Sequence, residues 1–288
     1  MSSPRLSDVG ELGLLAELEQ RGLVVGVEHD AAELADGLVV TQDALVEDVH
    51  FRLEWTSWRD LGWKAAAVNL SDLAASAAMP DALIVTLAAP PDTAVDDVLE
   101  LYAGMAETGV PVRGGDTTSA EHVVLSVTAI GHSERVPGRA GARPGDLLVV
   151  TGPLGGSGAG YRALRDGRAD PRVAFHLRPP LRLAEGLRLG AVATAMLDVS
   201  DGIAIDAAHL ARRSRVRVIV DLDAVPRAGE LEDLGFGEDY ELLAATPDPL
   251  DFAVIGRCED GEGVELLLAG EPVSLPGWQH FASRPGSG

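Results

Sequence analysis

The 288-residue sequence contains one lysine and one cysteine, and it has no long apolar run. The lysine, Lys64, lies in the segment WKAAAVN and not in a G-x-x-x-x-G-K-[ST] pattern, which excludes a P-loop nucleotide site. The single cysteine, Cys258, cannot form an internal disulfide or a thiolate metal cage. No stretch approaches the roughly 18 continuous apolar residues that span a bilayer, and the N-terminal segment lacks the pattern of a signal peptide. We therefore expect a cytoplasmic protein with no membrane partner.

Basic side chains are also scarce. The chain has 23 Lys and Arg against 45 Asp and Glu, which gives a formal net charge of -22. Because an acidic surface repels a phosphate backbone, this balance excludes nucleic acid as the main partner. An anionic ligand would need local basic residues or bound cations. The apolar fraction of 46% is ordinary for a protein that buries a core, so disorder is not the default.

Apolar segments with strand-like and helix-like spacing occur in both halves of the chain. Strands are predicted at 38–41, 82–88, 110–113, 123–130, 147–151, 216–221, 240–245, 252–256 and 264–268. Helices are predicted at 7–21, 60–79, about 93–108, near 181–190 and near 202–213. The segment 132–146 is rich in Gly, Pro and Arg and marks a boundary. The sequence thus predicts an α+β (mixed α/β) protein with two domains, 1–135 and 136–288.

Aspartates recur beside small residues or glycine at the ends of apolar runs. Any one of them can be a turn former or a helix cap. Together they are harder to explain in that way, because converging carboxylates repel one another unless cations neutralise them. Carboxylate oxygens are ligands that suit Mg²⁺. The pattern therefore predicts a magnesium-binding set, whose members are Asp30, Asp43, Asp72, Asp116, Asp198 and Asp201.

Three of these features leave a second interpretation open. Asn69, Asp72 and Ser76 form a polar stripe on a helix rich in Ala and Leu, which is either part of a site or a solvated helix face. Asp116 follows two glycines, which allow close approach of a ligand or form a plain turn. The glycine-rich run 152–160 either holds phosphate through backbone N–H groups or makes a tight turn between a strand and a helix.

Six segments of the sequence together resemble the thiamine-monophosphate kinase family, which shares a superfamily with aminoimidazole ribonucleotide synthetase. They read VVTQDALVEDVHF, DLGWKAAAVNLSDLAASAAMP, RGGDTT, GARPGDLLVVTG, LDVSDG and GEDYELL. The resemblance implies two α/β domains, of which the N-terminal one forms a β-barrel shared with its twin in a homodimer. It also implies ATP and several Mg²⁺ ions in the cleft, and direct in-line phosphorylation of thiamine monophosphate to thiamine diphosphate.

The resemblance also implies roles for individual residues. Metal ligands are expected at Asp30, Thr41, Asp43, Asp72, Asp116, Asp198 and Asp201. Contacts to ATP are expected at Tyr102, Gly115, Asp116, Arg139 and Ser200, and contacts to thiamine monophosphate at His50, Glu238 and Trp278. The residues expected to act in catalysis are Asp43, Asp72, Asp116 and Asp198.

This chemistry needs few proton-transfer groups. The second pKa of a phosphate monoester is about 6, so the acceptor is already a nucleophilic dianion at neutral pH. The barrier is the repulsion between two polyanions, which metal ions and an arginine reduce. His29 stands where the family usually has an aspartate, and Gln42 where a hydroxyl residue is common. Two alternatives therefore stay open: a superfamily enzyme with another small phosphorylated or amide substrate, and a non-catalytic relative that binds nucleotide or thiamine phosphate.

Overall fold

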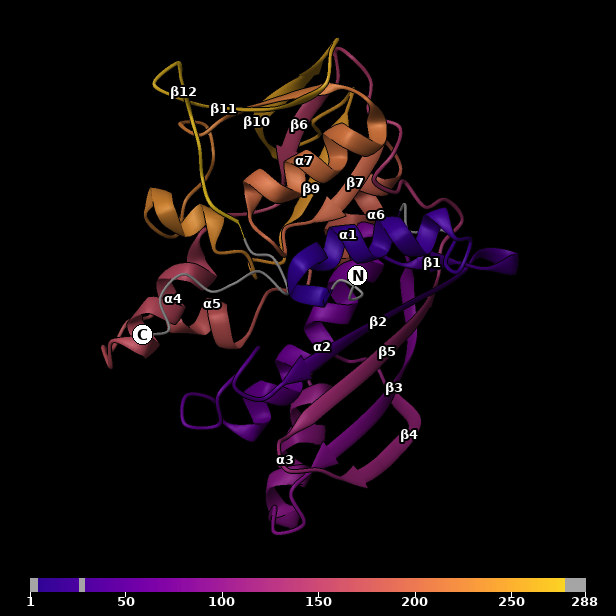
Figure 1. The fold of residues 1–288 in the computed structure, drawn as a ribbon, viewed down its shortest axis with the longest axis vertical. Coiled ribbons are helices and arrows are strands. Elements are labelled where there is room, and N and C mark those ends of the chain that lie inside the picture. The colour runs from indigo at the N-terminus through magenta and orange to yellow at the C-terminus, as the bar shows by residue number, and fades with distance from the viewer. Residues whose placement is uncertain (1–4, 26–28, 278–288) are drawn as a thin grey trace.

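The structure, a computed structural model, describes residues 5–25 and 29–277 (Figure 1). Trp278 lies outside these described residues. The first half of the chain forms α1 (Leu6–Gln20), β1 (Ala32–Glu33), a 3₁₀ turn at Ala35–Gly37, β2 (Leu38–Val46), α2 (Trp58–Ala75), β3 (Met79–Ala89), α3 (Val95–Ala106), β4 (Val112–Ser119) and β5 (Val124–His132).

The second half of the chain also contains both strands and helices. Its elements are β6 (Leu147–Val150), α4 (Gly156–Arg165), α5 (Val173–Leu177), α6 (Leu183–Gly190), β7 (Ala195–Asp198), α7 (Ile203–Ser214), β8 (Arg217–Asp221), a 3₁₀ turn at Leu231–Gly235, β9 (Leu242–Thr246), β10 (Ala253–Glu259), β11 (Gly263–Leu268) and β12 (Glu271–Val273). Among the helices of the described segments, none is long and apolar enough to cross a membrane.

The first half contributes a five-stranded sheet in the order β1-β2-β5-β3-β4, in which β4 runs parallel to β3 and the other pairs are antiparallel. Because strand side chains alternate between faces, Val85 and Val127 point to one face and are buried under α2. Thr86 and Thr128 point to the opposite face and are only half-buried. We call this second surface the open face of the sheet.

The second half contributes a seven-stranded sheet in the order β12-β11-β8-β10-β6-β9-β7. Its apolar core packs against α7 through residues such as Leu210 and Val218. Near β7 the sheet also contacts α2, since Ala74 and Ala75 pack with Met196 and Leu242. Helix α2 therefore lies between the two sheets, in the centre of Figure 1, and contacts elements from both halves of the chain.

Helix α2 is held in this position by close backbone packing against α3. A Cβ atom added at Gly62 would lie 1.8 Å from the carbonyl oxygen of Leu101, and one at Gly104 would lie 1.9 Å from that of Arg59. Glycine at both positions thus allows the two helices to touch along their backbones. Any larger side chain at either position would push the two helices apart.

The predicted elements are mostly present, with differences at their ends. Helix α2 ends at Ala75 instead of residue 79, because Ala77 adopts a left-handed backbone conformation (φ 50°) and Met79 already begins β3. Four short elements were not predicted from the sequence, namely β1, β7, α5 and β12, because their 2 to 5 residues are too few for a periodic pattern. The prediction of a mixed α/β protein is correct, whereas the five-stranded sheet of this chain is open at β1 and β4.

Candidate functional site

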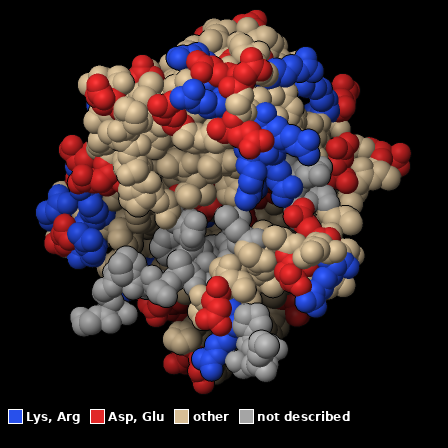
Figure 2. Space-filling view, turned by 45° about the horizontal axis from the view of Figure 1, so that its top comes forward, with Lys and Arg blue, Asp and Glu red and all other residues tan. Residues whose placement is uncertain are grey.

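A cavity of about 910 Å³ is lined by residues of β2, α2, α7 and the loops that precede α7 and β9. Ten of the predicted site residues line it: Asp30, Thr41, Asp43, His50, Asp72, Arg139, Asp198, Ser200, Asp201 and Glu238. On the face of the molecule seen in Figure 2, acidic side chains are spread among basic ones. The acidic residues of the cavity are therefore distinguished by their closeness to one another and their burial, and not by the overall charge.

Three carboxylates converge at one end of the cavity, which we call the acidic end. One oxygen each of Asp30, Asp72 and Asp198 lie within 4.8 Å of one another. Hydroxyl groups fix two of them: Thr41 Oγ1 donates to Asp72 Oδ2 at 2.5 Å, and Ser71 Oγ donates to Asp198 Oδ2 at 2.5 Å. Such hydrogen bonds hold the carboxylates in fixed directions before any cation arrives.

The electrostatics of this acidic end show that its negative charge is not balanced by the protein. Burial, and then the repulsion from Asp30, raises the pKa of Asp198 to about 8 and that of Asp43 to about 6. Burial followed by the neighbouring aspartates raises the pKa of Asp72 well above its usual range. Arg139 donates from Nε to Asp30 Oδ1 at 2.8 Å and is one cation against four carboxylates. The donor set and its charge fit a divalent cation such as Mg²⁺.

The polar stripe of α2 is not a solvated helix face, because Asn69 and Ser76 are buried and Asp72 is half-buried. Asn69 is fully buried, and its Oδ1 accepts a hydrogen bond from the backbone N–H of Asp43 at 3.0 Å. Its Nδ2 donates to the carbonyl oxygen of Ala65 at 3.1 Å. Ser76, at the end of the helix, is 1% exposed. Asn69 thus fixes the strand that carries Asp43 against the helix that carries Asp72.

Another part of the cavity is formed by His50 and Glu238. His50 Nδ1 accepts a hydrogen bond from the backbone N–H of Val46 at 3.0 Å. Glu238 and Tyr240 both have left-handed backbone conformations, with φ values of 55° and 51°. Non-glycine residues adopt such conformations at a cost, often at functional sites. The N–H of Glu238 donates to the carbonyl oxygen of Ser200 at 2.8 Å, which connects this loop to the one that carries Asp198 and Asp201.

Two residues next to Glu238 were not predicted from the sequence. Lys64 Nζ lies 3.1 Å from Glu238 Oε2, and His176 Nδ1 lies 3.2 Å from the same oxygen. Lys64 was considered only as a possible P-loop residue. Its position inside an apolar helix was the available signal, since a lysine buried without a partner is very costly.

Three predicted site residues do not line the cavity. Asp116 lies opposite Thr86 on β4, and therefore on the open face, whereas Asp43 points to the face covered by α2. Three strand spacings separate β4 from β2, or about 14 Å. Asp116 and Asp43 of one chain therefore cannot bind the same ion. Gly115 packs so closely on β3 that an added Cβ would lie 1.7 Å from the Val85 carbonyl oxygen, and Tyr102 is half-buried against the core beneath α3.

In the glycine-rich run 152–160, residues 152–155 make a tight turn and residues 156–160 form the start of α4. Its backbone N–H groups at the start of α4 are already bonded to a side chain, since those of Gly155 and Ser157 donate to the carboxylate of Asp239 at 2.7 and 3.1 Å. Gly155 has a φ of 81°, which favours glycine. The alternative in which this run holds a phosphate is therefore wrong.

Comparison with known proteins shows the family to which the chain belongs. The pattern of the AIR synthase related protein N-terminal domain matches residues 28–133, and that of the C-terminal domain matches residues 143–269. The thiamine-monophosphate kinase of Aquifex aeolicus is 34% identical, with 96% of this chain and 100% of the relative covered. That of Mycobacterium tuberculosis is 35% identical, with 99% and 96% covered. The chain belongs to the thiamine-monophosphate kinase family.

Solved structures of this family have the same fold. The structure described as AaThiL complexed with AMPPCP and TMP superimposes with a TM-score of 0.90 at 33% identity, covering 97% of this chain and 100% of the other. A Thermus thermophilus protein gives a TM-score of 0.81 at 30% identity, covering 94% and 100%. The Escherichia coli hydrogenase maturation protein HypE, at 20% identity and a TM-score of 0.69 over 92% and 96%, shares the fold alone. The prediction of two domains of this superfamily type is confirmed.

Proposed function

We propose that this protein transfers the γ-phosphoryl group of ATP directly, by in-line attack, to the phosphate of thiamine monophosphate and so forms thiamine diphosphate. The observation that carries the proposal is the convergence of Asp30, Asp72 and Asp198 in a cavity whose wall also carries His50 and Glu238. A cavity of this kind offers a cation site for phosphates and a separate polar site for the acceptor. The related structure with an ATP analogue and TMP supports both substrates.

In this proposal the acidic end holds Mg²⁺. Its ligands are the carboxylates of the cavity together with Thr41: Asp30, Asp43, Asp72, Asp198 and Asp201. Bound Mg²⁺ would neutralise phosphate charge and hold the two substrates in line. Arg139, which already neutralises Asp30, and Ser200 line the same end and are proposed to contact ATP.

The protein's own contribution to the acceptor is binding and orientation. His50 and Glu238 line the cavity and are proposed to contact thiamine monophosphate, and Trp278 completes the predicted set. The acceptor phosphate is a dianion at neutral pH, so no side chain has to remove a proton from it. This agrees with a site in which carboxylates outnumber candidate bases.

We also propose a homodimer in which the open faces of two sheets form a shared β-barrel. The open face exposes part of Ile84 and Ile130, and all side chains of β4 after Val112 are exposed at its edge. A second copy would cover this surface and bring its own Asp116 and Gly115, with Tyr102, toward the phosphates. In the same proposal, residues 1–135 form the dimerisation domain and residues 136–288 the second domain.

The direct test is a reaction of the purified protein with ATP, Mg²⁺ and thiamine monophosphate, followed by chromatography of the products. We expect thiamine diphosphate and ADP in equal amounts. The absence of product at every Mg²⁺ and Mn²⁺ concentration would contradict the proposal, and binding of both ligands by calorimetry in that case would favour the non-catalytic alternative.

A further inference from the structure

We propose that Lys64, the only lysine of the chain, is a positioning residue for the phosphate acceptor: its ammonium group fixes the Glu238 carboxylate in the orientation that binds thiamine monophosphate. The inference rests on the proposed function and adds to it a residue on α2. It assigns a role to a buried charged side chain outside the acidic end of the cavity.

The surroundings of Lys64 allow few partners. The residue is 2% exposed and lies in a part of α2 whose other residues are apolar (LGWKAAAV). Its ammonium group contacts Glu238 Oε2 at 3.1 Å and the carbonyl oxygen of His50 at 3.4 Å. Both residues line the cavity. A buried ammonium group with these two contacts connects α2 to both proposed acceptor-binding residues at once.

Glu238 is held from two sides through one of its oxygens. His176 on α5 contacts the same Oε2 at 3.2 Å, and because a carboxylate only accepts hydrogen bonds, Nδ1 of His176 is the donor. These contacts, with attraction to Lys64 leading, outweigh the effect of burial and lower the pKa of Glu238 to about 2. Among the described residues no hydrogen bond reaches Oε1, which is left for an N–H donor or a positive ring in the cavity.

The charges of this cluster explain why a lysine is needed. Burial, and then repulsion from Lys64, lowers the pKa of His176, so the imidazole is neutral at physiological pH. The remaining cation is then the ammonium group, and Glu238 and Lys64 together carry no net charge. Without Lys64, the carboxylate would be buried next to a neutral donor alone, which costs much more than the pair.

The other polar groups around His176 do not replace this cation. Ser157 on α4 contacts Nδ1 at 3.0 Å, and the Tyr161 ring lies 5.6 Å away, centroid to centroid. Arg52, in the segment between β2 and α2, lines a small pocket together with His176 and Lys64. Its guanidinium group contacts Asp48 and Glu54, and the side chain is 43% exposed. Arg52 is therefore paired with carboxylates on the surface and not with Glu238.

The first experiment measures steady-state kinetics of Lys64→Met, a change that keeps the length of the side chain. At about pH 8 we expect the KM for thiamine monophosphate to rise about 30-fold. This is the smaller end of the range of affinity losses that follow the removal of one partner of a buried charge pair. The KM for ATP should stay within about twofold, because the cation end of the cavity is unchanged. The matched control is Arg188→Met, whose partner Asp251 lies on the surface; it should leave both constants unchanged.

The second readout is pH. In Lys64→Met the repulsion that lowers the pKa of His176 is gone and the attraction to Glu238 remains, so that pKa rises. As the pH falls, more of the imidazole becomes imidazolium, which carries the charge of the lost ammonium group, so the KM defect should be smaller at about pH 6 than at about pH 8. The double variant Lys64→Met, His176→Gln should show no such recovery. An equal defect at both pH values, or a rise of the KM for ATP by the same factor, would overturn the inference.

A third measurement needs no variant. Protein labelled with ¹³C only at lysine Cε carries a single labelled lysine, so its NMR spectrum reports on Lys64 directly. We expect saturating thiamine monophosphate to shift this signal and a non-hydrolysable ATP analogue to leave it nearly in place. If the protein forms thiamine diphosphate but its lysine signal does not shift when thiamine monophosphate is added, the role of Lys64 alone is overturned. Wild-type protein that makes no thiamine diphosphate would overturn the proposed function instead.

Discussion

Helix α2 contributes Asp72 to the acidic end of the cavity and Lys64 to the region around Glu238 and His176, which we call the Lys64 end. The two regions differ in how their buried charges are balanced. At the acidic end, carboxylates around Asp72 face one arginine, and burial raises the pKa values of Asp72, Asp43 and Asp198. At the Lys64 end, one carboxylate faces one ammonium group, and the pKa of Glu238 is lowered to about 2. The first region needs a cation from outside, whereas the second is already neutral.

The difference separates two kinds of binding site within one cavity. A region whose own charges repel one another gains most from a divalent cation and its bound phosphates. A region that is balanced internally gains nothing from a metal and instead presents a fixed hydrogen-bond acceptor. Substitutions at the two ends should therefore differ in their effects on stability, on metal dependence and on the two substrates.

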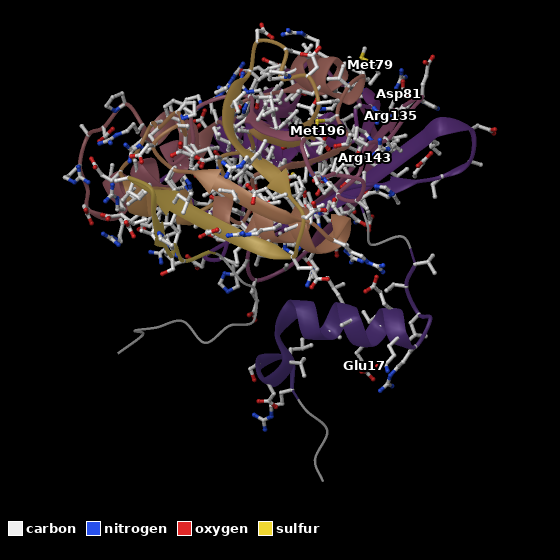
Figure 3. The ribbon with its side chains drawn as sticks, turned by 90° about the horizontal axis from the view of Figure 1, so that it is seen from above. Glu17, Met79, Asp81, Arg135, Arg143 and Met196 are labelled. Atoms are coloured by element: carbon white, nitrogen blue, oxygen red, sulfur yellow. The ribbon has the colours of Figure 1, made fainter. Side chains whose placement is uncertain are left out.

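The largest effect is expected from Asp72→Asn at the acidic end. We expect turnover to fall on the order of a thousandfold, because the variant loses a charged oxygen ligand at the phosphate site. The melting temperature of the metal-free protein should not fall, since the change removes buried repulsion. Kinetics and thermal melts check this. Asp81→Asn is the control, because Asp81 lies near the start of β3 (Figure 3) and pairs with the exposed His132. A variant that unfolds, or one that stays fully active, would contradict a metal role for Asp72.

The proposed dimer can be tested by mixing subunits. Asp116→Asn alone should be strongly impaired if Asp116 serves the active site of a second copy. When Asp72→Asn and Asp116→Asn chains are unfolded together and refolded, half of the dimers are mixed and each has one intact site, so about a quarter of wild-type activity should return. If Asp116 acts within its own chain, the mixture stays as inactive as its parts. Activity assays before and after refolding distinguish the two.

The residues of the acidic end could be predicted from the sequence, but which of the predicted residues lie together in space could not. Strand-end aspartates with no basic neighbours indicated a cation site, and ten of the predicted residues line one cavity. Asp116 was predicted to share the metal site with them because the sequence does not show how its strand pairs with the neighbouring strand. The parallel pairing of Asp116 with Thr86 places it on the other face, and such a pairing between distant strands cannot be read from one sequence.

The contacts of Lys64 could not be predicted from the sequence for a related reason. Its three charged or titratable groups, Lys64, His176 and Glu238, come from α2, α5 and the loop before β9, and are far apart in the chain. Helix α5 itself was not predicted, so His176 had no structural context. What a sequence does offer is the anomaly of one lysine in an apolar helix, which implies a buried counter-charge without saying where that charge lies.

A smaller effect is expected from Ser71→Ala, which removes a hydrogen bond to a carboxylate of the acidic end. Ser71 Oγ donates to Asp198 Oδ2 at 2.5 Å and is buried. Loss of such a supporting contact typically weakens metal binding about tenfold or more, so the Mg²⁺ concentration for half-maximal activity should rise by about that factor. The control is Ser133→Ala in the loop after β5, whose Oγ is hydrogen-bonded to the backbone of Arg135. An unchanged Mg²⁺ dependence would contradict a supporting role.

The smallest effect concerns the response of the acidic end to pH. The pKa values of Asp43 and Asp198 are raised to about 6 and about 8 from an ordinary value of 3.8, so the metal-free folded protein retains protons that the unfolded chain has lost. The stability of the metal-free protein should therefore fall as the pH rises from about 4 to about 8. Mg²⁺ must displace these protons, so it binds more tightly as the pH rises through the same window. We expect saturating Mg²⁺ to raise the melting temperature by about 3 °C more at pH 8 than at pH 6. NaCl of equal ionic strength is the control, and an Mg²⁺ effect that is equal or larger at pH 6 would show that these carboxylates do not bind the ion.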